Sequence, residues 1–584
     1  MVVKHMVRNG EVDIAVYEQG NPDGPVILLL HGWPDSHHLW DNVVPEFIDR
    51  FRVLSVDNPG HGESTNPEGS LAISIEALAE DYVAVIEQLC PDESVHVLAH
   101  DWGSVAMWEV VCRPDAARLV ASFTSVCGPS LAHTAAWARS RLTRPTPRNI
   151  ALPLAQLGSF AYSTVLALPV LPNTALEFGT SERLWRTMLS ATEGATAENI
   201  HLAPTFEQDM ANGLRIYRST WASNPPRARE ARTEVPVQII IGTRDPAVRR
   251  SSYTDEDRWA DAVWPRVVEG GHWLPFSHPA LLAAATVELI DATAGAPPAR
   301  SLRRARMGVR RAPFEDQLVV ITGGGSGIGR QTALAFAREG AEIVVSDIDG
   351  IAAEATVALI AQAGGLGHAY ELDVSDEDAV REHADDVLSE HGVPDVLINN
   401  AGIGQAGRFL DTSSDDFQRV PDVNLRGVVN GCRAFAGPMA DRGLGGHIVN
   451  LSSTAAYPPQ QGFSAYSTSK AAVFMFSDCL RAELAGRGIG VSTVCPGIVH
   501  TNIVRTTRMS GVSADAEARR QQIYDRLYRL RGYGPDKVAE QIVRAVQKNK
   551  QVVPVTPEAR LQYVFQRLAP GLVRFGAARG SLVR

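Results

Sequence analysis

Three residues in the first half of the chain have the types and the order that nucleophilic catalysis requires. Asp101 stands at the centre of Ala99-His-Asp-Trp-Gly103, after an apolar run and before a helical stretch. A strand, a sharp turn and a helix in this order expose the central side chain to an electrophile. Asp245 and His272 follow later apolar runs, in the chain order nucleophile, acid, histidine. We expect His272 to act as a general base and Asp245 to orient it.

The turn after the first long apolar run supplies a second element of this chemistry. His31-Gly-Trp-Pro34 can present the backbone N–H of Trp33 beside that of Trp102, which predicts an oxyanion hole. Taken singly, these residues have ordinary structural explanations: Asp101 as a helix cap, Asp245 as a turn residue and His272 as a loop histidine. The complete set, in order and at strand ends, favours catalysis.

A second group of reactive side chains lies in the other half of the chain. Tyr466 and Lys470 are four residues apart and share one helix face, so the ammonium group is expected to lower the pKa of the phenol. Tyr466 then becomes a usable general acid and base. Ser453, thirteen residues before Tyr466, and Asn424 are further candidates, although each could be structural.

A glycine-rich turn in the same half predicts a dinucleotide site. Leu318 to Gly329 reads as an apolar strand, a turn with several glycines and a helix start, which lets the backbone approach a pyrophosphate. Asp347 lies twenty residues past Gly327, at the end of the next apolar run. A carboxylate there accepts from a ribose 2′-hydroxyl and repels a 2′-phosphate. NAD is favoured over NADP; Ser326 is not basic, whereas Arg330 keeps NADP open.

The first half resembles the epoxide hydrolase branch of the α/β-hydrolase superfamily, through HGWPDS, DNPGHGES, AHDWGS and GGHW. In that family two lid tyrosines activate the epoxide, and Tyr162 and Tyr217 stand at the corresponding places, although Ile216 replaces a common aromatic. The resemblance implies an Asp101 ester, its hydrolysis through His272 and release of a vicinal diol, without a cofactor. Tyr162 and Tyr217 could instead be lid core. A haloalkane dehalogenase is the alternative, although Trp33 stands where many of those enzymes have a halide-binding Asn.

The second half resembles the short-chain dehydrogenase/reductase (SDR) family in the glycine turn, Asn399-Asn-Ala-Gly402, Asn424, Ser453, the Tyr466/Lys470 pair and Pro496-Gly497 with Thr501. The resemblance implies that Tyr466 transfers the hydroxyl proton, Ser453 orients the substrate, Lys470 also binds the nicotinamide ribose and Asn424 supports a water relay. It implies these cofactor contacts: Gly323, Gly325, Ser326, Gly327, Ile328, Gly329, Asp347, Asp373, Val374, Asn400, Ala401, Gly402, Tyr466, Lys470, Pro496, Gly497 and Thr501.

These residues need two α/β domains to position them. The chain has 584 residues, more than one hydrophobic core usually serves. We predict an α/β-hydrolase domain over 1–293 with a helical lid over about 130–229, an Arg-rich linker over 294–313 and a Rossmann-fold SDR domain over 314–584. Expected strands are Val26–Leu30, Arg52–Val56, Val95–Ala99, Leu119–Thr124, Val237–Ile241, Arg266–Val268, Leu318–Ile321, Ile343–Ser346, His368–Leu372, Val396–Ile398, His447–Leu451 and Gly490–Val494.

Composition limits the partners. With 55 basic and 66 acidic side chains the net charge is −11, which disfavours nucleic acid. The six cysteines have no metal-binding spacing and no secretory leader is evident, so we expect a reducing cytoplasm and no metal. The uncharged segment 149–176 is interrupted by polar residues and prolines and is not expected to span a membrane. The linker arginines fit a solvated hinge, or contact with anionic lipid or with an acidic domain surface.

The whole chain resembles actinobacterial fusions of an epoxide hydrolase with a dehydrogenase. A diol made in one half is an alcohol that the other half could oxidise, and the apolar lid suggests hydrophobic, lipid-like epoxide and alcohol substrates. The alternative is that one half is a scaffold. The helical stretch from Ala559 to Phe575 favours a docking or dimer helix over a membrane anchor. A homodimer or tetramer through the dehydrogenase half is expected.

Overall fold

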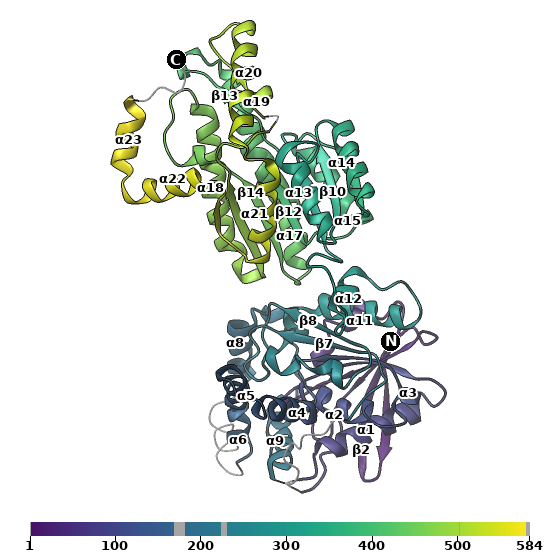
Figure 1. The fold of residues 1–584 in the computed structure, drawn as a ribbon. Coiled ribbons are helices and arrows are strands. Elements are labelled where there is room, and N and C mark those ends of the chain that lie inside the picture. Colours follow the sequence, from purple (N-terminus) through teal and green to yellow (C-terminus); the bar gives the residue numbers. More distant parts are fainter. Residues whose placement is uncertain (1, 70, 169–181, 223–230, 502, 580–584) are drawn as a thin grey trace. The chain divides into compact units, whose positions relative to one another are not determined.

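The computed structural model describes residues 2–69, 71–168, 182–222, 231–501 and 503–579. The chain forms two compact units, Met1–Val309 (the first unit) and Arg310–Arg584 (the second unit), and each has its own central sheet (Figure 1). In the described ranges no helix is both long and apolar enough to cross a membrane.

The first unit is built on an eight-stranded sheet in the order β1-β2-β4-β3-β5-β6-β7-β8. β1 and β2 are antiparallel to their neighbours and the remaining strands are parallel. Residues of β3 and β7 are buried throughout, as parallel strands covered on both faces require. The strands are β1 Val3–Asn9, β2 Val12–Gly20, β3 Val26–Leu30, β4 Arg52–Val56, β5 Val95–His100, β6 Val120–Val126, β7 Val237–Gly242 and β8 Val263–Val268.

Helices cover this sheet and form a lid. α1 (Ile75–Leu89), α2 (Asp101–Val111), α3 (Ala116–Leu119), α10 (Leu274–Ser277) and α11 (Pro279–Thr293) accompany the strands. Between β6 and β7 the chain forms the lid that the sequence predicts, although residues 169–181 and 223–230 of that range lie outside the described residues. Its helices are α4 Leu131–Leu142, α5 Pro147–Ser159, α6 Ala161–Leu166, α8 Glu182–Glu193 and α9 Phe206–Ala222.

The segment expected to be a linker packs on the first unit up to Val309. It contains a short helix, α12 (Arg300–Ala305), whose Leu302 is fully buried. Arg306 lies over the ring of Trp264, 4.6 Å from its centroid, and donates to the Asp261 carbonyl. An extended, solvated hinge therefore does not describe residues 300–306, because an apolar anchor and a stacked guanidinium hold them on the domain.

The second unit has a seven-stranded, all-parallel sheet in the order β11-β10-β9-β12-β14-β15-β17. The strand order reverses between β9 and β12, so loops diverge there at the carboxyl ends, which is where such sheets bind ligands. The strands are β9 Leu318–Thr322, β10 Glu342–Asp347, β11 Gly367–Glu371, β12 Val396–Asn399, β14 Gly446–Leu451, β15 Ile489–Cys495 and β17 Val552–Pro554.

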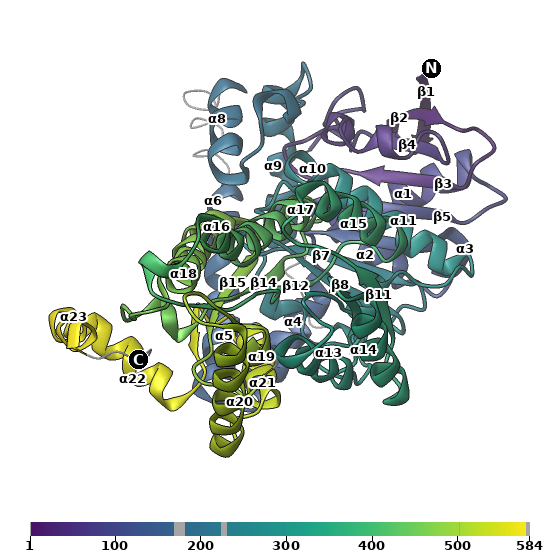
Figure 2. The same ribbon diagram turned by 90° about the horizontal axis from the view of Figure 1, so that it is seen from above.

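Helices lie on both faces of this sheet (Figures 1 and 2). The helices of this unit are α13 Gly327–Arg338, α14 Gly350–Gln362, α15 Glu377–Glu390, α16 Ser414–Pro421, α17 Gly427–Asp441, α18 Ser464–Leu484, α19 Ile503–Thr506, α20 Ala514–Arg531, α21 Pro535–Gln547, α22 Pro557–Leu568 and α23 Pro570–Arg579, of which α20, α22 and α23 project away from the sheet. The small strands β13 (Gln405–Ala406) and β16 (Arg508–Met509) pair above the main sheet's carboxyl edge.

Candidate active sites

Asp101 occupies the sharp turn that joins β5 to α2. Its φ of +48° is in the left-handed region, which a non-glycine residue adopts only when its surroundings enforce it. A Cβ at Gly32 would collide with the Asp101 carboxylate, and a Cβ at Gly128 would collide with the Asp101 carbonyl. The glycines therefore let two loops close against the nucleophile that the sequence predicts, and its side chain lies at the start of a helix.

His272 lies between the two carboxylates that the sequence assigns to it. Its Nδ1 is 3.0 Å from Asp245 Oδ2 and its Nε2 is 3.7 Å from Asp101 Oδ1. Burial opposes protonation of His272, but Asp245 and Asp101 outweigh it and raise its pKa well above the usual value. The resting site therefore favours an imidazolium held between two anions.

Asp245 is fixed from both sides. Its Oδ1 accepts from the backbone N–H groups of Ala247 (2.7 Å) and Val248 (3.1 Å). Burial disfavours its ionisation, but the His272 charge and these N–H groups hold the pKa of Asp245 below the ordinary value. The carboxylate thus stays ionised and keeps the imidazole in orientation.

The Trp33 amide points at the nucleophile. Its N–H donates to Asp101 Oδ2 at 3.0 Å, while the indole N–H donates to the Met210 carbonyl at 2.9 Å. Trp102 follows Asp101 directly in the first turn of α2. An oxygen of the Asp101 carboxyl is therefore already bound by one of the two expected oxyanion donors.

Both predicted tyrosines lie in the lid near the nucleophile. Tyr162 on α6 and Tyr217 on α9 have ring centroids 6.3 Å apart, and the Tyr217 ring is 5.0 Å from that of Trp102. Burial, followed by the Tyr162 and Asp101 charges, raises the pKa of Tyr217. Tyr162 is 41% exposed, and its phenol is protonated at neutral pH because the ordinary tyrosine pKa is about 10. Each hydroxyl therefore stays protonated and can donate to an oxygen bound near Asp101.

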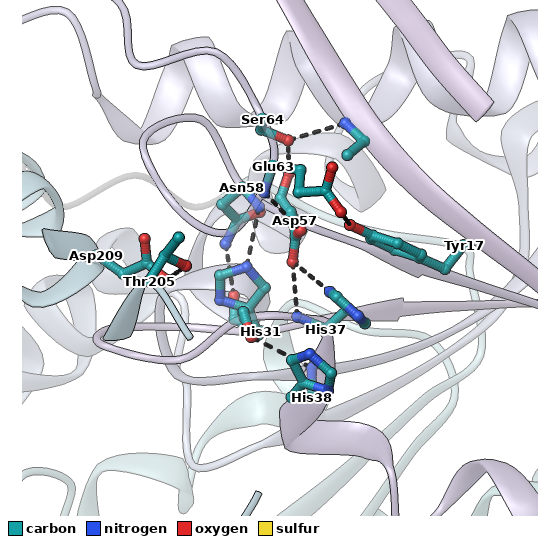
Figure 3. A network of polar contacts seen from close by, with 12 residues as sticks. Tyr17, His31, His37, His38, Asp57, Asn58, Glu63, Ser64, Thr205 and Asp209 are labelled. Atoms are coloured by element: carbon teal, nitrogen blue, oxygen red, sulfur yellow. Dashed lines mark hydrogen bonds and ion pairs between the residues drawn. The ribbon is translucent and has the colours of Figure 1, made fainter. Parts of the chain in front are cut away.

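A buried polar network shapes the turn that carries Trp33 (Figure 3). Asp57 accepts from the backbone N–H and from Nδ1 of His37, each at 2.8 Å. His31 Nε2 accepts from the Asn58 N–H at 2.9 Å, and the Asn58 side-chain amide donates to the His31 carbonyl at 2.7 Å. Burial lowers the pKa of His31 to about 3, so this histidine is a neutral structural group.

Two buried carboxylates beside the site escaped the sequence reasoning. Glu193, the last residue of α8, accepts from the His272 backbone N–H at 3.1 Å. Asp35 accepts from the Trp273 indole N–H at 3.0 Å, and burial followed by the nearby Asp101 charge raises its pKa to about 7. Asp35 lies within HGWPDS and could have been singled out there, whereas nothing in the sequence around Glu193 connects it with His272.

In the second unit the glycine turn has the shape that a pyrophosphate requires. Gly323 (φ +65°) and Gly327 (φ +53°) adopt left-handed backbone conformations, and a Cβ at Gly323 would come within 2.7 Å of Ala401. Gly325 N–H donates to Asp347 Oδ2 at 2.8 Å, and a Cβ at Gly325 would fill the space beside that carboxylate. The bare turn, the helix start at Gly327 and Asp347 fit a dinucleotide.

The remaining expected cofactor residues surround this turn. Asn400 donates to the carbonyls of Thr322 (3.1 Å) and Gly323 (2.8 Å), so its amide holds the turn. Thr501 faces Gly327. Arg330 donates to Gly325 and Ala352 carbonyls and to the Thr356 hydroxyl, so its guanidinium is committed to the protein. The other expected cofactor residues lie in the loops and helix starts that follow β9, β11, β12 and β15. They are Ser326, Ile328, Asp373, Val374, Ala401, Gly402, Pro496 and Gly497.

Ser453, Tyr466, Lys470 and Asn424 lie beyond the ends of β12 and β14. Ser453 hydrogen-bonds with Tyr466 and lowers its pKa, but burial raises it more, so the net shift is upward. Lys470 Nζ donates to the Leu451 carbonyl at 2.8 Å and lies 6.0 Å from the Tyr466 ring centroid. The expected lowering of the Tyr466 pKa by Lys470 is therefore wrong for this state, because the lysine is directed to a carbonyl. Burial lowers the pKa of Lys470 to about 8.

Asn424 lies in a π-helical turn, η7 (Asp422–Arg426), between α16 and α17. Its amide accepts from the Ile403 N–H (2.8 Å) and donates to the Ile403 carbonyl (3.0 Å) and to the Ser469 hydroxyl (3.2 Å). Such π-turns occur mostly at functional sites. Asn424 thus fixes the loop beside Lys470.

Glu342, His368 and His391 form a cluster with metal-ligand side chains at the opposite, amino-terminal edge of this sheet. His368 Nε2 lies 3.0 Å from Glu342, and Tyr370 hydroxyl lies 2.8 Å from His391 Nε2. These hydrogen bonds account for the cluster without an ion.

Comparison with known proteins gives the class of each unit. Residues 27–285 match the alpha/beta hydrolase family and residues 317–510 match the short chain dehydrogenases. The C alpha-dehydrogenase of Sphingobium sp. is 35% identical over 254 residues, 42% of this chain and 83% of that protein. A crystal structure of an SDR from Burkholderia phymatum in complex with NAD is 30% identical, covers 44% of this chain and 95% of its own, and has a TM-score of 0.41.

The chain is therefore an α/β-hydrolase domain joined to a Rossmann-fold SDR domain, and the latter implies a nicotinamide cofactor. Over 571 residues it is 48% identical to a Mycobacterium tuberculosis protein named probable oxidoreductase EphD, with 96% of both chains covered. It belongs to the family of two-domain hydrolase–SDR proteins that includes EphD.

Proposed function

We propose that this protein is a bifunctional enzyme that hydrolyses an epoxide to a vicinal diol and oxidises or reduces an alcohol or ketone. The observation that carries the first activity is the pair of protonated phenols, Tyr162 and Tyr217, close to an aspartate at the nucleophile position. An ester nucleophile opposite two hydroxyl donors suits a substrate whose leaving group is an oxygen on the same molecule.

In the first step Asp101 opens the ring. A carboxylate oxygen forms a bond to one epoxide carbon as the carbon–oxygen bond breaks, and the departing oxygen takes a proton from Tyr162 or Tyr217. The product is an Asp101 ester of a 2-hydroxyalkyl group. Loss of the Asp101 charge also removes one of the two anions that keep His272 protonated.

Once the Asp101 charge is lost, His272 passes its proton to the phenolate, directly or through solvent, and becomes a neutral base. In the second step this neutral His272 removes a proton from water, and the hydroxide attacks the Asp101 carboxyl carbon. The Trp33 N–H, which contacts this carboxyl group at 3.0 Å in the resting protein, stabilises the tetrahedral oxyanion. Cleavage of the ester releases the diol. The hydroxyl proton of the tetrahedral intermediate goes to the departing alkoxide, and His272 keeps the proton taken from water, which restores the resting imidazolium between Asp101 and Asp245.

The second unit is proposed to act on an alcohol carbon. The glycine turn and Asp347 would hold a nicotinamide cofactor, which when bound would supply hydride transfer at that carbon. Tyr466 takes or returns the hydroxyl proton, Ser453 holds the substrate oxygen and Lys470 binds the ribose. Asp347 supports NAD over NADP, because its carboxylate repels a 2′-phosphate and Arg330 is bonded to the protein instead.

The haloalkane dehalogenase alternative is less well supported. A halide needs N–H donors, and the Trp33 indole N–H is bound to Met210. The Trp102 indole N–H is buried without a hydrogen-bond partner among the described residues, but the two lid phenols suit an oxygen leaving group better than a halide. The scaffold alternative is also weakened, because both units contain the expected reactive side chains. They are Asp101, Asp245 and His272 in the first unit and Ser453, Tyr466 and Lys470 in the second.

The test uses the full chain with a long-chain epoxide and NAD⁺, following the diol by mass spectrometry and NADH by absorbance. Asp101→Ala should abolish the diol, and Tyr466→Phe should abolish NADH but not the diol. Asp92→Ala, an exposed carboxylate, and Tyr370→Phe are matched controls that should retain both. Formation of diol without NADH would contradict oxidation of the diol by the second unit. Absence of diol would favour the dehalogenase alternative for the first unit.

A trapping experiment tests the ester itself. His272→Gln should still form the Asp101 ester but hydrolyse it slowly, so the intact mass of the protein should rise by that of one epoxide. Asp101→Ala in the same background should show no added mass.

A further inference from the structure

The last two helices of the second unit present their apolar side chains outward. α22 and α23 lie at the rim of this unit (Figures 1 and 2). Six large apolar side chains there are between 49% and 81% exposed, at spacings of three, one, three, four and three residues. They are Leu561, Val564, Phe565, Leu568, Leu572 and Phe575. Leu561, Val564, Phe565 and Leu568 share one face of α22, and Leu572 and Phe575 share one face of α23, which begins after the break at Ala569. These two exposed apolar faces are called the stripe below.

The opposite face of α22 is polar and faces the domain. The side-chain oxygens of Gln562 and Gln566 are buried, and no hydrogen-bond partner for them exists among the described residues. Tyr563, between them, packs on Tyr457 with ring centroids 5.3 Å apart. A helix adapted to water would carry its amides outward and its leucines inward, so this arrangement indicates that an apolar medium covers the outer face.

The charge on these helices favours an anionic surface. Residues 559–579 contain Arg560, Arg567, Arg574 and Arg579 and no acidic residue, in a chain whose net charge is −11. All four arginines are exposed. Two-fold pairing with a second copy would bring identical basic surfaces together, whereas an anionic lipid layer attracts them while its hydrocarbon takes up the apolar stripe.

This surface borders the dehydrogenase site. α22 contacts the short helix η8 (Thr454–Ala456), which follows Ser453 directly. The Gln461 amide, between Ser453 and Tyr466, donates to the carbonyls of Ala577 (3.1 Å) and Ala578 (3.3 Å) at the end of α23. α20, whose Tyr528 affects the pKa of Tyr466, exposes three more apolar side chains, Ile523, Leu527 and Leu530.

We propose that α22 and α23 dock on an anionic lipid surface and that the SDR site takes a long-chain alcohol or ketone from that surface. The substrate part of this inference rests on the proposed function of Tyr466. Docking itself does not, because it depends only on the stripe and the arginines.

The test is flotation of the full chain with vesicles of phosphatidylglycerol and phosphatidylcholine, compared with phosphatidylcholine alone. We expect at least tenfold more protein on the anionic vesicles, falling with added salt. The double variant Leu568→Asp/Leu572→Asp and the double variant Arg567→Glu/Arg574→Glu should each lose this binding tenfold. Leu366→Asp and Arg487→Glu, exposed positions on other elements, are the matched controls and should bind normally.

Two outcomes overturn the proposal. The first is anionic-vesicle binding that is absent or unaffected by both double variants. The second is a change from dimer to monomer in Leu568→Asp/Leu572→Asp, measured by light scattering, which would assign the stripe to a second copy. If the wild-type protein binds the anionic vesicles, oxidation of a vesicle-borne long-chain alcohol should fall in the two double variants, while oxidation of a short soluble alcohol should not. Tyr466→Phe should lose both oxidations but still bind the vesicles. A wild-type protein that binds the vesicles and oxidises neither alcohol would contradict the redox proposal alone.

Discussion

His272 is held between two carboxylates, and one of them disappears when the proposed ester forms. In the resting protein the Asp101 and Asp245 charges raise the His272 pKa despite burial. Esterification removes the Asp101 charge, so His272 should release its proton when a base is needed. The Asp101 charge therefore makes His272 a poor base in the resting protein, and loss of that charge in the ester makes His272 a base for the next step.

Asp101→Asn imitates this loss of charge. We expect the pKa of His272 to fall, because one of the two carboxylate charges that raise it is gone. Titration of the imidazole by NMR measures it. A His272 pKa that is unchanged in Asp101→Asn would contradict the proposed switch, and Asp92→Asn provides the control.

The lid tyrosines should contribute to ring opening only. Tyr217→Phe removes one donor near Asp101, so we expect the rate of ester formation to fall by about 10²–10⁴-fold, with ester hydrolysis unaffected. Rapid-quench measurement of the two phases distinguishes them. Tyr253→Phe, a buried tyrosine outside the proposed pair, should leave ester formation near the wild-type rate.

At the scale of elements, the lid helix α8 also supports the catalytic histidine. Glu193 ends this helix and accepts the His272 backbone N–H at 3.1 Å. Glu193→Ala leaves that donor without its partner and should lower the free energy of unfolding by about 1–3 kcal/mol and slow ester hydrolysis. Glu193→Gln keeps an acceptor oxygen and should restore most of both. Denaturant unfolding and single-turnover ester hydrolysis measure the two effects. Equal losses in Glu193→Ala and Glu193→Gln would contradict a role for the Glu193 acceptor oxygen.

Asp347 joins the end of β10 to the glycine turn. Replacing its carboxylate with Ser should weaken NAD binding by about 10–100-fold, because a hydrogen bond to a charged group is lost, and should weaken NADP binding less. Fluorescence titration with both dinucleotides gives the ratio. Asp385→Ser, an exposed carboxylate on α15, is the control, and an unaltered NAD to NADP preference in Asp347→Ser would refute the assignment.

At the scale of the whole molecule, the two units have separate cores and should unfold separately. Calorimetry of the full chain should show two transitions, and NAD at about 100 times its Kd should stabilise only one of them, by about 2.7 kcal/mol. Tyr466→Phe should keep both transitions. A single transition that moves as a whole with NAD would contradict this independence. Assembly through the second unit stays a prediction that light scattering can test.

The sequence by itself determined the two parallel folds and the reactive residues at their strand ends. All twelve expected strands exist, because buried parallel strands are continuous apolar runs bounded by glycine-rich turns. Several are longer than expected, and β6 and β11 are shifted by one or two residues, since Leu119 belongs to α3 and Leu372 lies outside β11. β1, β2, β17 and the two-residue strands β13 and β16 escaped it. β1 and β17 are edge strands, β2 lies between β1 and β4, and partly exposed or very short strands give a weaker apolar signal.

Only the tertiary structure decided what surrounds those residues. Glu193 reaches His272 across 79 positions, and no local pattern records a contact of that separation. The direction of the Tyr466 pKa depends on burial and on where Lys470 points, neither of which the four-residue spacing fixes. Likewise, the sequence does not tell which side chains of α22 and α23 are exposed. That becomes known only from the face of each helix that packs against the domain. Motifs lie within short stretches of chain, whereas burial and charge environment are properties of the packed whole.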